Sequence, residues 1–509
     1  MLTRKKIQTS IVLVFGILIL LNLISSKMFF RLDFTADKRY SLSEATENIL
    51  DELNDPVTVT AYFSEDLPPD VAKVRQDFQD LLVEYSSLSN GQVVFEFINP
   101  NEDQQTEMEA QQSGISPVMI NVRERDQMKQ QRAYLGAVIQ LGEKKEVIPL
   151  IQPGTAMEFT LSSNIKKLAV HSKPKVAFFK GNGSPSLAAL QQLNQALSVM
   201  YEVEEFEFND SVKTIPFIYK TFIVVAPTDS LPAEYFSRFD EYLSKGGRMI
   251  VALNKVEGDL QNSQGKVQST GFGDWLAEKG LEVEPSFVVD QSCASITVQQ
   301  RQGMFVMNTP VRFPYLPIIT TFMEHPITEG LEAVILPFAS PLNIVPKDTS
   351  ITIYPIASSS GKSGVEKAPV FFNIQKEWKP SDFNLPSVTV AAVMEGKLAG
   401  DTKSKMVVFG DGDFVVNGEG QEAQQLQGDN VNLMVNAIDW LSDDTGLIEL
   451  RTRGITARPI DASLEDGTKT LLKYLNFLLP LILIIGYGVF RFQVKRKLRN
   501  KLSTVDYVE

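Results

Sequence analysis

The segment TFIVVAPTDSLPAEYFSRFDEYLSKGGRMIVALN (221–254) indicates most directly how the larger part of this chain folds. Its two ends, 221–227 and 248–254, are short apolar runs typical of buried strands, and residues 232–245 between them have helical periodicity. Gly246-Gly247 marks the turn after that helix. A strand, a helix and a second strand in this order form a parallel pair joined by a crossover helix. We therefore expect an α/β fold with a doubly wound, mainly parallel sheet.

The same alternation continues on both sides of this segment. Strands are expected at 175–181 and 201–208, with a helix at 186–199 between them and another helix near 271–279. From 281 to 404 the strands become short and Pro is frequent, so we interpret this region as a β-rich insertion. The α/β pattern resumes with a strand at 405–417, expected to belong to the second sheet, and a helix at 430–443.

A smaller α/β unit precedes this one. A helix that begins near Ser41–Ser43 and reaches about Leu53 is followed by a strand (57–64), a helix (about 70–87) and a strand (93–100). The unit resembles a thioredoxin-type fold without the redox cysteines, which is a fold-level analogy. Further strands at about 117–123, 134–141 and 145–151 are expected to complete its sheet, and a linker helix at 158–171 leads to the second unit.

Two apolar segments, 7–26 and 471–490, are each long enough to cross a bilayer as a helix. For the first, a cleaved signal peptide is the alternative, but no small-x-small cleavage site follows it, which favours an uncleaved anchor. For the second, the alternative is a buried helix of a soluble core. The basic run RFQVKRKLRNK (491–501) directly after it argues against that alternative.

Basic residues set the expected orientation. Residues 1–6 carry a charge of +3, and residues 491–509 carry +4, from six Lys and Arg against two acids. Because basic residues favour the cytoplasmic side, both termini are expected inside the cell. The body between the spans is then expected in the periplasm of a bacterium, anchored in the inner membrane.

These observations predict a domain order along the whole chain. In sequence, the parts are a cytoplasmic N-terminus (1–6), a first transmembrane helix (7–26), a membrane-proximal helix with the small α/β domain (27–155), a linker helix (156–172), the first part of the second α/β domain (173–280), its β-rich insertion (281–404), its closing strand and helix (405–446), a linker (447–470), a second transmembrane helix (471–490) and a basic cytoplasmic tail (491–509).

Composition excludes several classes of function. The chain of 509 residues has a net charge of −13, and residues 7–490 carry −20, which argues against nucleic-acid binding. A single cysteine, Cys293, excludes an intramolecular disulfide, a CxxC redox pair and a Cys-rich zinc site. With two histidines, His171 and His325, a His-rich catalytic metal centre is not expected.

Two glycine-containing turns are candidate ligand sites. Gly181–Pro185 lies between a strand and a helix, where backbone N–H groups can bind an anion, but it matches neither nucleotide-binding fingerprint. Gly410–Asp413 follows a strand and offers two carboxylates without the spacing of an EF-hand. For both, a plain or capped turn is the simpler interpretation.

The nucleophile and base candidates are weaker still. Cys293 has no strand–elbow–helix context, and His325 lies in His-Pro-Ile-Thr, so a Cys–His pair would have to form by tertiary proximity. His171 ends the predicted linker helix and is expected at the surface. We therefore predict no catalytic, cofactor-binding or metal-binding residue.

A family resemblance runs through nearly the whole chain. The chain resembles the auxiliary component of the gliding-motility ABC transporter, the GldG-like family. The segments that carry the resemblance, in order, are RLDFTADKRYSLSEAT (31–46), Asp55-Pro56-Val57, Tyr134–Ala137, Lys245–Arg248, His325–Leu331, FGDGDFVVN (409–417), NAIDWL (436–441) and IELRTRGITARPID (448–461).

The resemblance implies a non-catalytic membrane subunit that works with an ABC permease and a cytoplasmic ATPase, and a cell-envelope or substrate partner for the exterior domains. The ATPase is expected on another chain, because this sequence has no Walker A motif. The second α/β unit is also similar to class I glutamine amidotransferases, which place a nucleophilic Cys after a central strand. Here the strand at 221–227 runs into Thr228-Asp229-Ser230, which puts that activity in doubt. A membrane-anchored amidotransferase-like hydrolase is the alternative.

Overall fold

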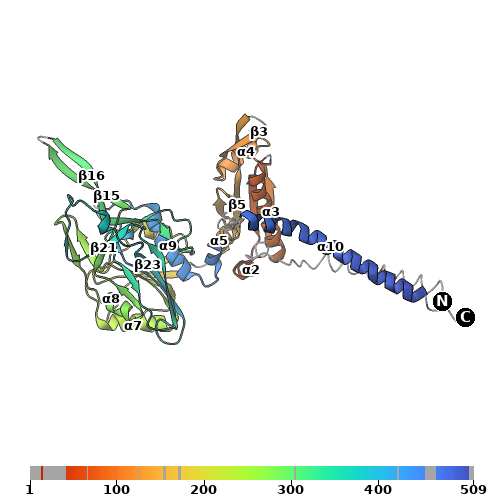
Figure 1. Ribbon diagram of the computed structural model, residues 1–509. Coiled ribbons are helices and arrows are strands. Elements are labelled where there is room, and N and C mark those ends of the chain that lie inside the picture. Colours follow the sequence, from red (N-terminus) through yellow and green to blue (C-terminus); the bar gives the residue numbers. More distant parts are fainter. Residues whose placement is uncertain are drawn as a thin grey trace. The chain divides into compact units, whose positions relative to one another are not determined.

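The computed structural model describes residues 13, 14, 16, 42–65, 67–124, 127–152, 156–169, 173–302, 305–420, 423–452 and 466–503 (Figure 1). The chain divides into two compact units, Met1–Gly454 and Ile455–Glu509. The first unit contains two α/β regions, and the second contains one long helix.

The smaller α/β region is built on a four-stranded sheet with the order β2-β1-β5-β6. β1 (Val57–Phe63) and β2 (Val93–Ile98) are parallel and are joined by α3 (Pro69–Leu88), while β5 (Leu135–Leu141) and β6 (Lys144–Ile148) are antiparallel additions. Alternate residues of β1 are buried against Phe78, Leu82 and Tyr85 of α3. Helices α2 (Glu44–Asp51), α4 (Gln104–Gln112) and α5 (Met157–Ala169) complete the region.

One predicted strand of this region has a different partner. The strand expected at 117–123 forms β3 (Val118–Glu124), but it pairs with β4 (Gln127–Ala133) in a separate two-stranded sheet. The position beside β1 is occupied by β5, whose residues Leu135, Ala137 and Ile139 are buried in the core. β4 has the polar sequence QMKQQRA, so it pairs locally and leaves the core position to the apolar strand.

The larger region contains an eight-stranded sheet with the order β17-β20-β23-β24-β10-β9-β7-β8. Five neighbouring strands are parallel. They are β24 (Ser404–Phe409), β10 (Arg248–Ala252), β9 (Tyr219–Val225), β7 (Lys175–Phe179) and β8 (Glu202–Phe206).

Helices cover both faces of this sheet. Alternate residues of each central strand enter different cores: Ile250 and Ala252 of β10 pack with α6 (Gln191–Leu197) and α9 (Gly428–Ser442), whereas Met249 and Val251 pack with α7 (Ala233–Ser244) and α8 (Phe272–Glu278). A strand buried on both faces must be apolar along its whole length. This requirement explains the continuous apolar runs of the sequence.

The expectation of an inserted region at 281–404 is corrected in one respect. Three of its strands, β17 (Thr321–Phe322), β20 (Ile351–Ser358) and β23 (Thr389–Gly396), extend the large sheet in antiparallel fashion. The next strand, β24, then lies between β23 and β10. Outside the sheet, β15 (Cys293–Gln302) and β16 (Phe305–Ile319) form a hairpin that projects from this region (Figure 1). The other strands of 253–388 form small sheets. One contains β11 (Val256–Asp259), β12 (Gln264–Val267) and β22 (Val370–Phe371), and a second contains β13 (Leu281–Val283) and β19 (Leu342–Ile344). A third contains β14 (Ser286–Asp290) and β21 (Ser363–Lys367), and β18 (Val334–Ile335) pairs with β16.

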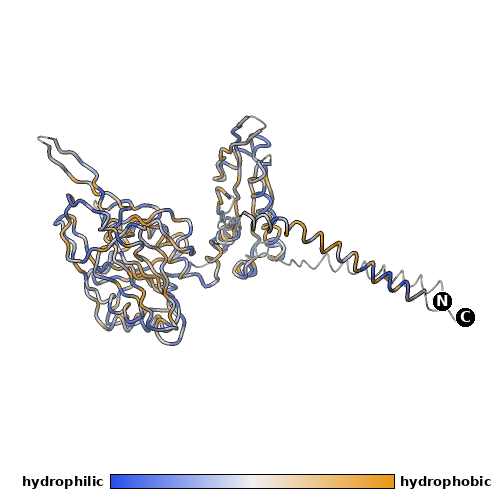
Figure 2. Tube along the Cα trace, viewed as in Figure 1, coloured by the Kyte–Doolittle hydropathy of each residue, from blue (hydrophilic) through white to orange (hydrophobic). Residues whose placement is uncertain are grey.

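The second unit contains helix α10 (Asp466–Ser503). Among the described residues, α10 is the one helix long and apolar enough to cross a membrane, over Lys473–Asn500, and its apolar middle is visible in Figure 2. This part includes most of the predicted span 471–490. The other predicted span, 7–26, lies outside the described residues except for Leu13, Val14 and Gly16, which are helical.

We predict that Phe239→Ala lowers the free energy of unfolding of the larger region by about 3–5 kcal/mol, because it leaves a cavity in a close-packed core. Phe239 is fully buried and stacks on Phe272, with ring centroids 5.7 Å apart. Urea unfolding of the detergent-solubilised chain, followed by tryptophan fluorescence, measures the change. Phe217→Ala is the matched control, because Phe217 is 59% exposed, and equal losses in the two variants contradict the assignment of this core.

Candidate functional site

The two candidate turns lie at the carboxyl edge of the large sheet. β7 continues through α6 to β8 on one side, whereas β9 continues through α7 to β10 on the other. The chain therefore changes direction between β7 and β9, and this is where doubly wound sheets commonly bind ligands. Gly181–Pro185 follows β7, and Gly410–Asp413 follows β24.

The Gly181–Pro185 turn is tied to the segment that follows β9. The carbonyl oxygen of Asn182 accepts hydrogen bonds from the backbone N–H groups of Thr228 and Asp229, at 3.0 and 2.9 Å. Gly183 has φ +77°, and a Cβ there would lie 1.7 Å from Oγ1 of Thr228. The next helix, α6, begins only at Gln191 and has seven residues. These contacts hold the turn against the segment that follows the neighbouring strand β9. No helix N-terminus directly follows the turn to attract an anion.

The Gly410–Asp413 turn contains a fully buried carboxyl group. Oδ1 of Asp411 accepts a hydrogen bond from the N–H of Asp413 at 2.9 Å, and Oδ2 has no partner among the described residues. The N–H of Gly412 donates to Oδ1 of Asn254 at 2.7 Å. A Cβ on Gly412 would lie 2.8 Å from the backbone of Ala226, after β9. The turn thus covers the carboxyl ends of β9 and β10.

Burial disfavours the charged form of both acids in this turn. It raises the pKa of Asp411 well above its usual value, and the nearby Asp413 raises it further. Burial also raises the pKa of Asp413. The described residues contain no group of three or more His, Cys, Asp or Glu side chains arranged to hold a metal ion. The turn is therefore better suited to a structural role than to binding a cation.

Cys293 and His325 have different surroundings. Burial raises the pKa of the Cys293 thiol, whose neighbours include Arg312 and Asp290. The His325 ring contacts Trp440, with centroids 5.0 Å apart, and Tyr354. Burial lowers the pKa of His325 to about 4, so the ring is neutral at neutral pH. Neither side chain lies among the other's described contacts, and His171 lies outside the described residues.

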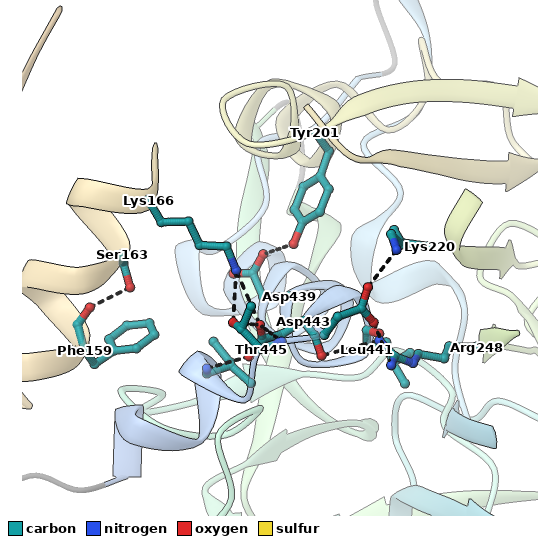
Figure 3. A network of polar contacts seen from close by, with 12 residues as sticks. Phe159, Ser163, Lys166, Tyr201, Lys220, Arg248, Asp439, Leu441, Asp443 and Thr445 are labelled. Atoms are coloured by element: carbon teal, nitrogen blue, oxygen red, sulfur yellow. Dashed lines mark hydrogen bonds and ion pairs between the residues drawn. The ribbon is translucent and has the colours of Figure 1, made fainter. Parts of the chain in front are cut away.

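A polar network at the end of α9 forms a second candidate site (Figure 3). Lys166 of α5 lies 3.5 Å from Oδ1 of Asp443 and 3.2 Å from Oγ1 of Thr445. The other carboxylate oxygen of Asp443 accepts the N–H of Ile448 at 2.8 Å. One carboxylate therefore joins the linker helix of the small region to the segment that leaves the large region.

Cations from the large sheet bind the same helix end. Arg248 of β10 donates to the carbonyl oxygens of Leu441 and Asp443 and pairs with Asp444 at 2.8 Å. Lys220 of β9 pairs with Asp444 at 2.7 Å. The last carbonyl groups of a helix have no intrahelical donors, and positive charge is favourable there. Arg248 therefore completes the end of α9 while fixing it to the sheet.

Apolar packing strengthens this junction. The short helix η4 (Leu447–Thr452) follows the network, and its Leu447 and Leu450 are buried in the core of the small region with Leu161 and Ile165 of α5. Among the described residues, charged and apolar contacts thus join the two α/β regions here. Beside it, an open cleft is lined by Glu44, Asn48, Asp51, Glu52, Asp444 and Thr445.

Sequence analysis missed the junction as a site. Arg248 lies in one of the segments that carry the family resemblance, and Asp443 lies just after another, but Lys166 lies in neither. A lysine in an amphipathic helix is ordinarily a solvated residue, so its sequence position alone contains no signal of this contact.

Comparisons with known sequences identify similar proteins. A family model described as "ABC-type uncharacterized transport system" matches residues 173–441, which is more than half of the chain. A second model, for a domain of unknown function, matches residues 36–140. An uncharacterized protein of Borreliella burgdorferi is 22% identical over 492 residues, which cover 92% of this chain and 94% of that protein.

Solved structures give weaker similarity. The N-terminal domain of mmIFT52 has a TM-score of 0.35 and 14% identity, covering 52% of this chain and 96% of that domain. A ThuA-like protein from Parabacteroides merdae has a TM-score of 0.29 and 13% identity, covering 57% and 94%. PurLQS from Thermotoga maritima has a TM-score of 0.24 and 11% identity, covering 53% and 99%. The thioredoxin-like and amidotransferase-like assignments gain no support from these values.

We predict that Asp411→Asn stabilises the protein at neutral pH by about 1–3 kcal/mol, because it removes the cost of ionising a buried carboxyl group. The folded-state pKa is raised, so wild-type stability falls as pH rises above the ordinary value near 4. The difference between variant and wild type should vanish below about pH 4. Urea unfolding between pH 4 and pH 7 measures it. A pH-independent difference contradicts the prediction, and Asp229→Asn, at an exposed position, is the control.

We also predict that Lys166→Ala loosens the junction. Without its cation, the nearly buried Asp443 holds the following turn less firmly, and hydrogen exchange of the Thr445 and Ile448 amides should rise by about five- to thirty-fold. Lys167→Ala is the matched control, because Lys167 pairs with Glu146 inside the small region at 2.7 Å. Equal exchange in the two variants argues against a role of Lys166 in joining the regions.

Proposed function

This chain belongs to the ABC-type uncharacterized transport system family, and from that membership we propose that it is a non-catalytic, membrane-anchored auxiliary subunit of an ABC transporter. Such a family implies permease and ATPase partners, and we propose that both are separate chains. The resemblance to the GldG-like family extends the proposal to a transporter of the gliding-motility type.

The family match over residues 173–441 carries this proposal, and the position of the junction in the chain supports a mechanism for it. The segment that leaves α9 passes through η4, and residues 453–465 then lead to α10. We propose that motion of α10 is passed along the chain to η4, which packs on the small region through Leu447 and Leu450 and on the large region through Ile448. We propose that ATP-driven motion of the partners displaces these regions together, as a rigid body.

The proposed topology has two spans with both termini in the cytoplasm. α10 supports the second span, and the basic clusters at 1–6 and 491–501 support the orientation. The two α/β regions are then proposed to lie in the periplasm, anchored in the inner membrane of a bacterium. There the acidic surface of the body is available to a substrate or cell-envelope partner.

The hydrolase alternative gains no support from the described residues. Cys293 and His325 have separate neighbours, and the thiol pKa is raised rather than lowered. A catalytic thiol needs a lowered pKa and an adjacent base. Thr228 and Asp229, where an amidotransferase would have its nucleophile, use their N–H groups to bind Asn182.

We predict that the full chain co-purifies with a permease and an ATPase in mild detergent. The measurement is affinity purification of the tagged chain from its native membrane, followed by mass spectrometry. The Lys166→Ala variant should retain both partners, because its change lies outside the membrane helix. Repeated recovery of the chain alone contradicts the proposal. A topology test complements that experiment: Lys362→Cys, at an exposed position, in a Cys293→Ser background should react with an impermeant thiol reagent in spheroplasts.

A further inference from the structure

In the proposed function, the cationic end of α10 bears only on the orientation of the chain, and no ligand is assigned to it. The helix continues without a break to Ser503, beyond the apolar segment that ends at Phe490. Residues 491–503 contain six Lys and Arg and no acid, whereas the chain as a whole has a net charge of −13. We refer to this part of α10 as the basic collar.

We propose that the basic collar binds the headgroups of anionic phospholipids in the leaflet where α10 leaves the membrane. This inference rests on the proposed membrane span. It assigns a class of ligand to the basic collar, because a cluster of four to eight cations next to a membrane helix matches the charge of an anionic lipid surface.

The length of the helix sets the depth of the collar. About twenty residues cross the hydrocarbon layer, so a span over 471–490 brings Arg491 to its boundary. The cations from 491 to 501 then extend about 15 Å further along the axis. Long Lys and Arg side chains can reach back toward the headgroups. The collar therefore begins where phosphate groups are concentrated.

The distribution of charge around the helix favours an anionic lipid over a protein as the binding partner of the collar. Successive helical residues are about 100° apart, so Lys495, Arg496 and Lys497 point to three different sides, and all three are exposed. A protein partner covers one side of a helix and leaves the other cations unpaired. A layer of headgroups surrounds the helix and can pair with all of them. Exposed Phe492 and Val494, between the cations, suit the boundary between headgroups and acyl chains.

The test compares the lipids retained by full-length wild type and by the variant K495Q/R496Q/K497Q. Both are reconstituted in vesicles of equal parts phosphatidylcholine and phosphatidylglycerol and then extracted in mild detergent. Mass spectrometry measures the ratio of the two lipids bound to the chain. Glutamine keeps a similar side-chain length and helix propensity. The matched control, K213Q/K347Q/K403Q, removes three exposed cations from the first unit.

We expect wild type to retain phosphatidylglycerol preferentially at about 0.05 M salt and to lose the preference at about 0.5 M. The preference of the collar variant for phosphatidylglycerol should be at least about five-fold lower than that of wild type, since each cation near an anionic surface contributes a factor of about five. The control variant should behave as wild type. Added inorganic phosphate, at matched ionic strength, should not displace the lipid, and displacement would identify a free-phosphate site instead.

An unchanged lipid preference in the collar variant also overturns the proposal. If that variant in addition loses the ATPase on co-purification, the collar is assigned to a protein contact. Carbonate extraction separates these results from failure of the proposed function: if wild type is released from the membrane, the membrane anchoring itself is wrong.

Discussion

The contacts of the Asp443 carboxylate are the interaction on which the organisation of the first unit depends. This carboxylate lies just beyond the end of α9. It binds Lys166 of the small region and the N–H of Ile448, in the segment that leaves the large region. The hydrogen bonds from Thr445 and Ile448, together with Lys166, hold the pKa of Asp443 below its usual value against the opposing effect of burial. At neutral pH this group is therefore charged, and the charge is satisfied from three directions. In the part of the chain that the structure describes, the polar contacts of Lys166 and the apolar packing of η4 thus join two α/β regions that have separate cores.

The large sheet makes this contact possible. Its central strands are buried on both faces, so α9 packs firmly over β9 and β10, and Arg248 at the start of β10 reaches the last carbonyl groups of α9. At the opposite edge, the turns after β7 and β24 are closed by hydrogen bonds from Thr228 and Gly412. In many doubly wound sheets that edge binds a ligand. In this chain its polar groups mainly bind one another, so the amino-terminal edge with the junction is the better candidate for function.

Residue patterns predicted the elements better than their pairing. The alternation at 221–254 identified β9, α7 and β10, and the apolar run at 471–490 identified the body of α10. The strand at 117–123 was found, but its partner was not, because β4 is polar and short-range pairing leaves little trace in periodicity. The region 281–404 was recognised as β-rich, yet the return of β20 and β23 to the large sheet depends on contacts between residues far apart in the chain.

The sequence by itself determined the α/β class, the apolar helix that follows the body, the acidic charge of that body and membership of an ABC-transporter auxiliary family, since these follow from local periodicity, composition and ordered motifs. The tertiary structure alone decided that Lys166 meets Asp443, that Asp411 is fully buried, and that Cys293 and His325 have different neighbours. The physical reason is the range of the interactions. Periodicity reports which side of an element is buried, whereas the partner of a charged or polar side chain is set by how distant elements pack.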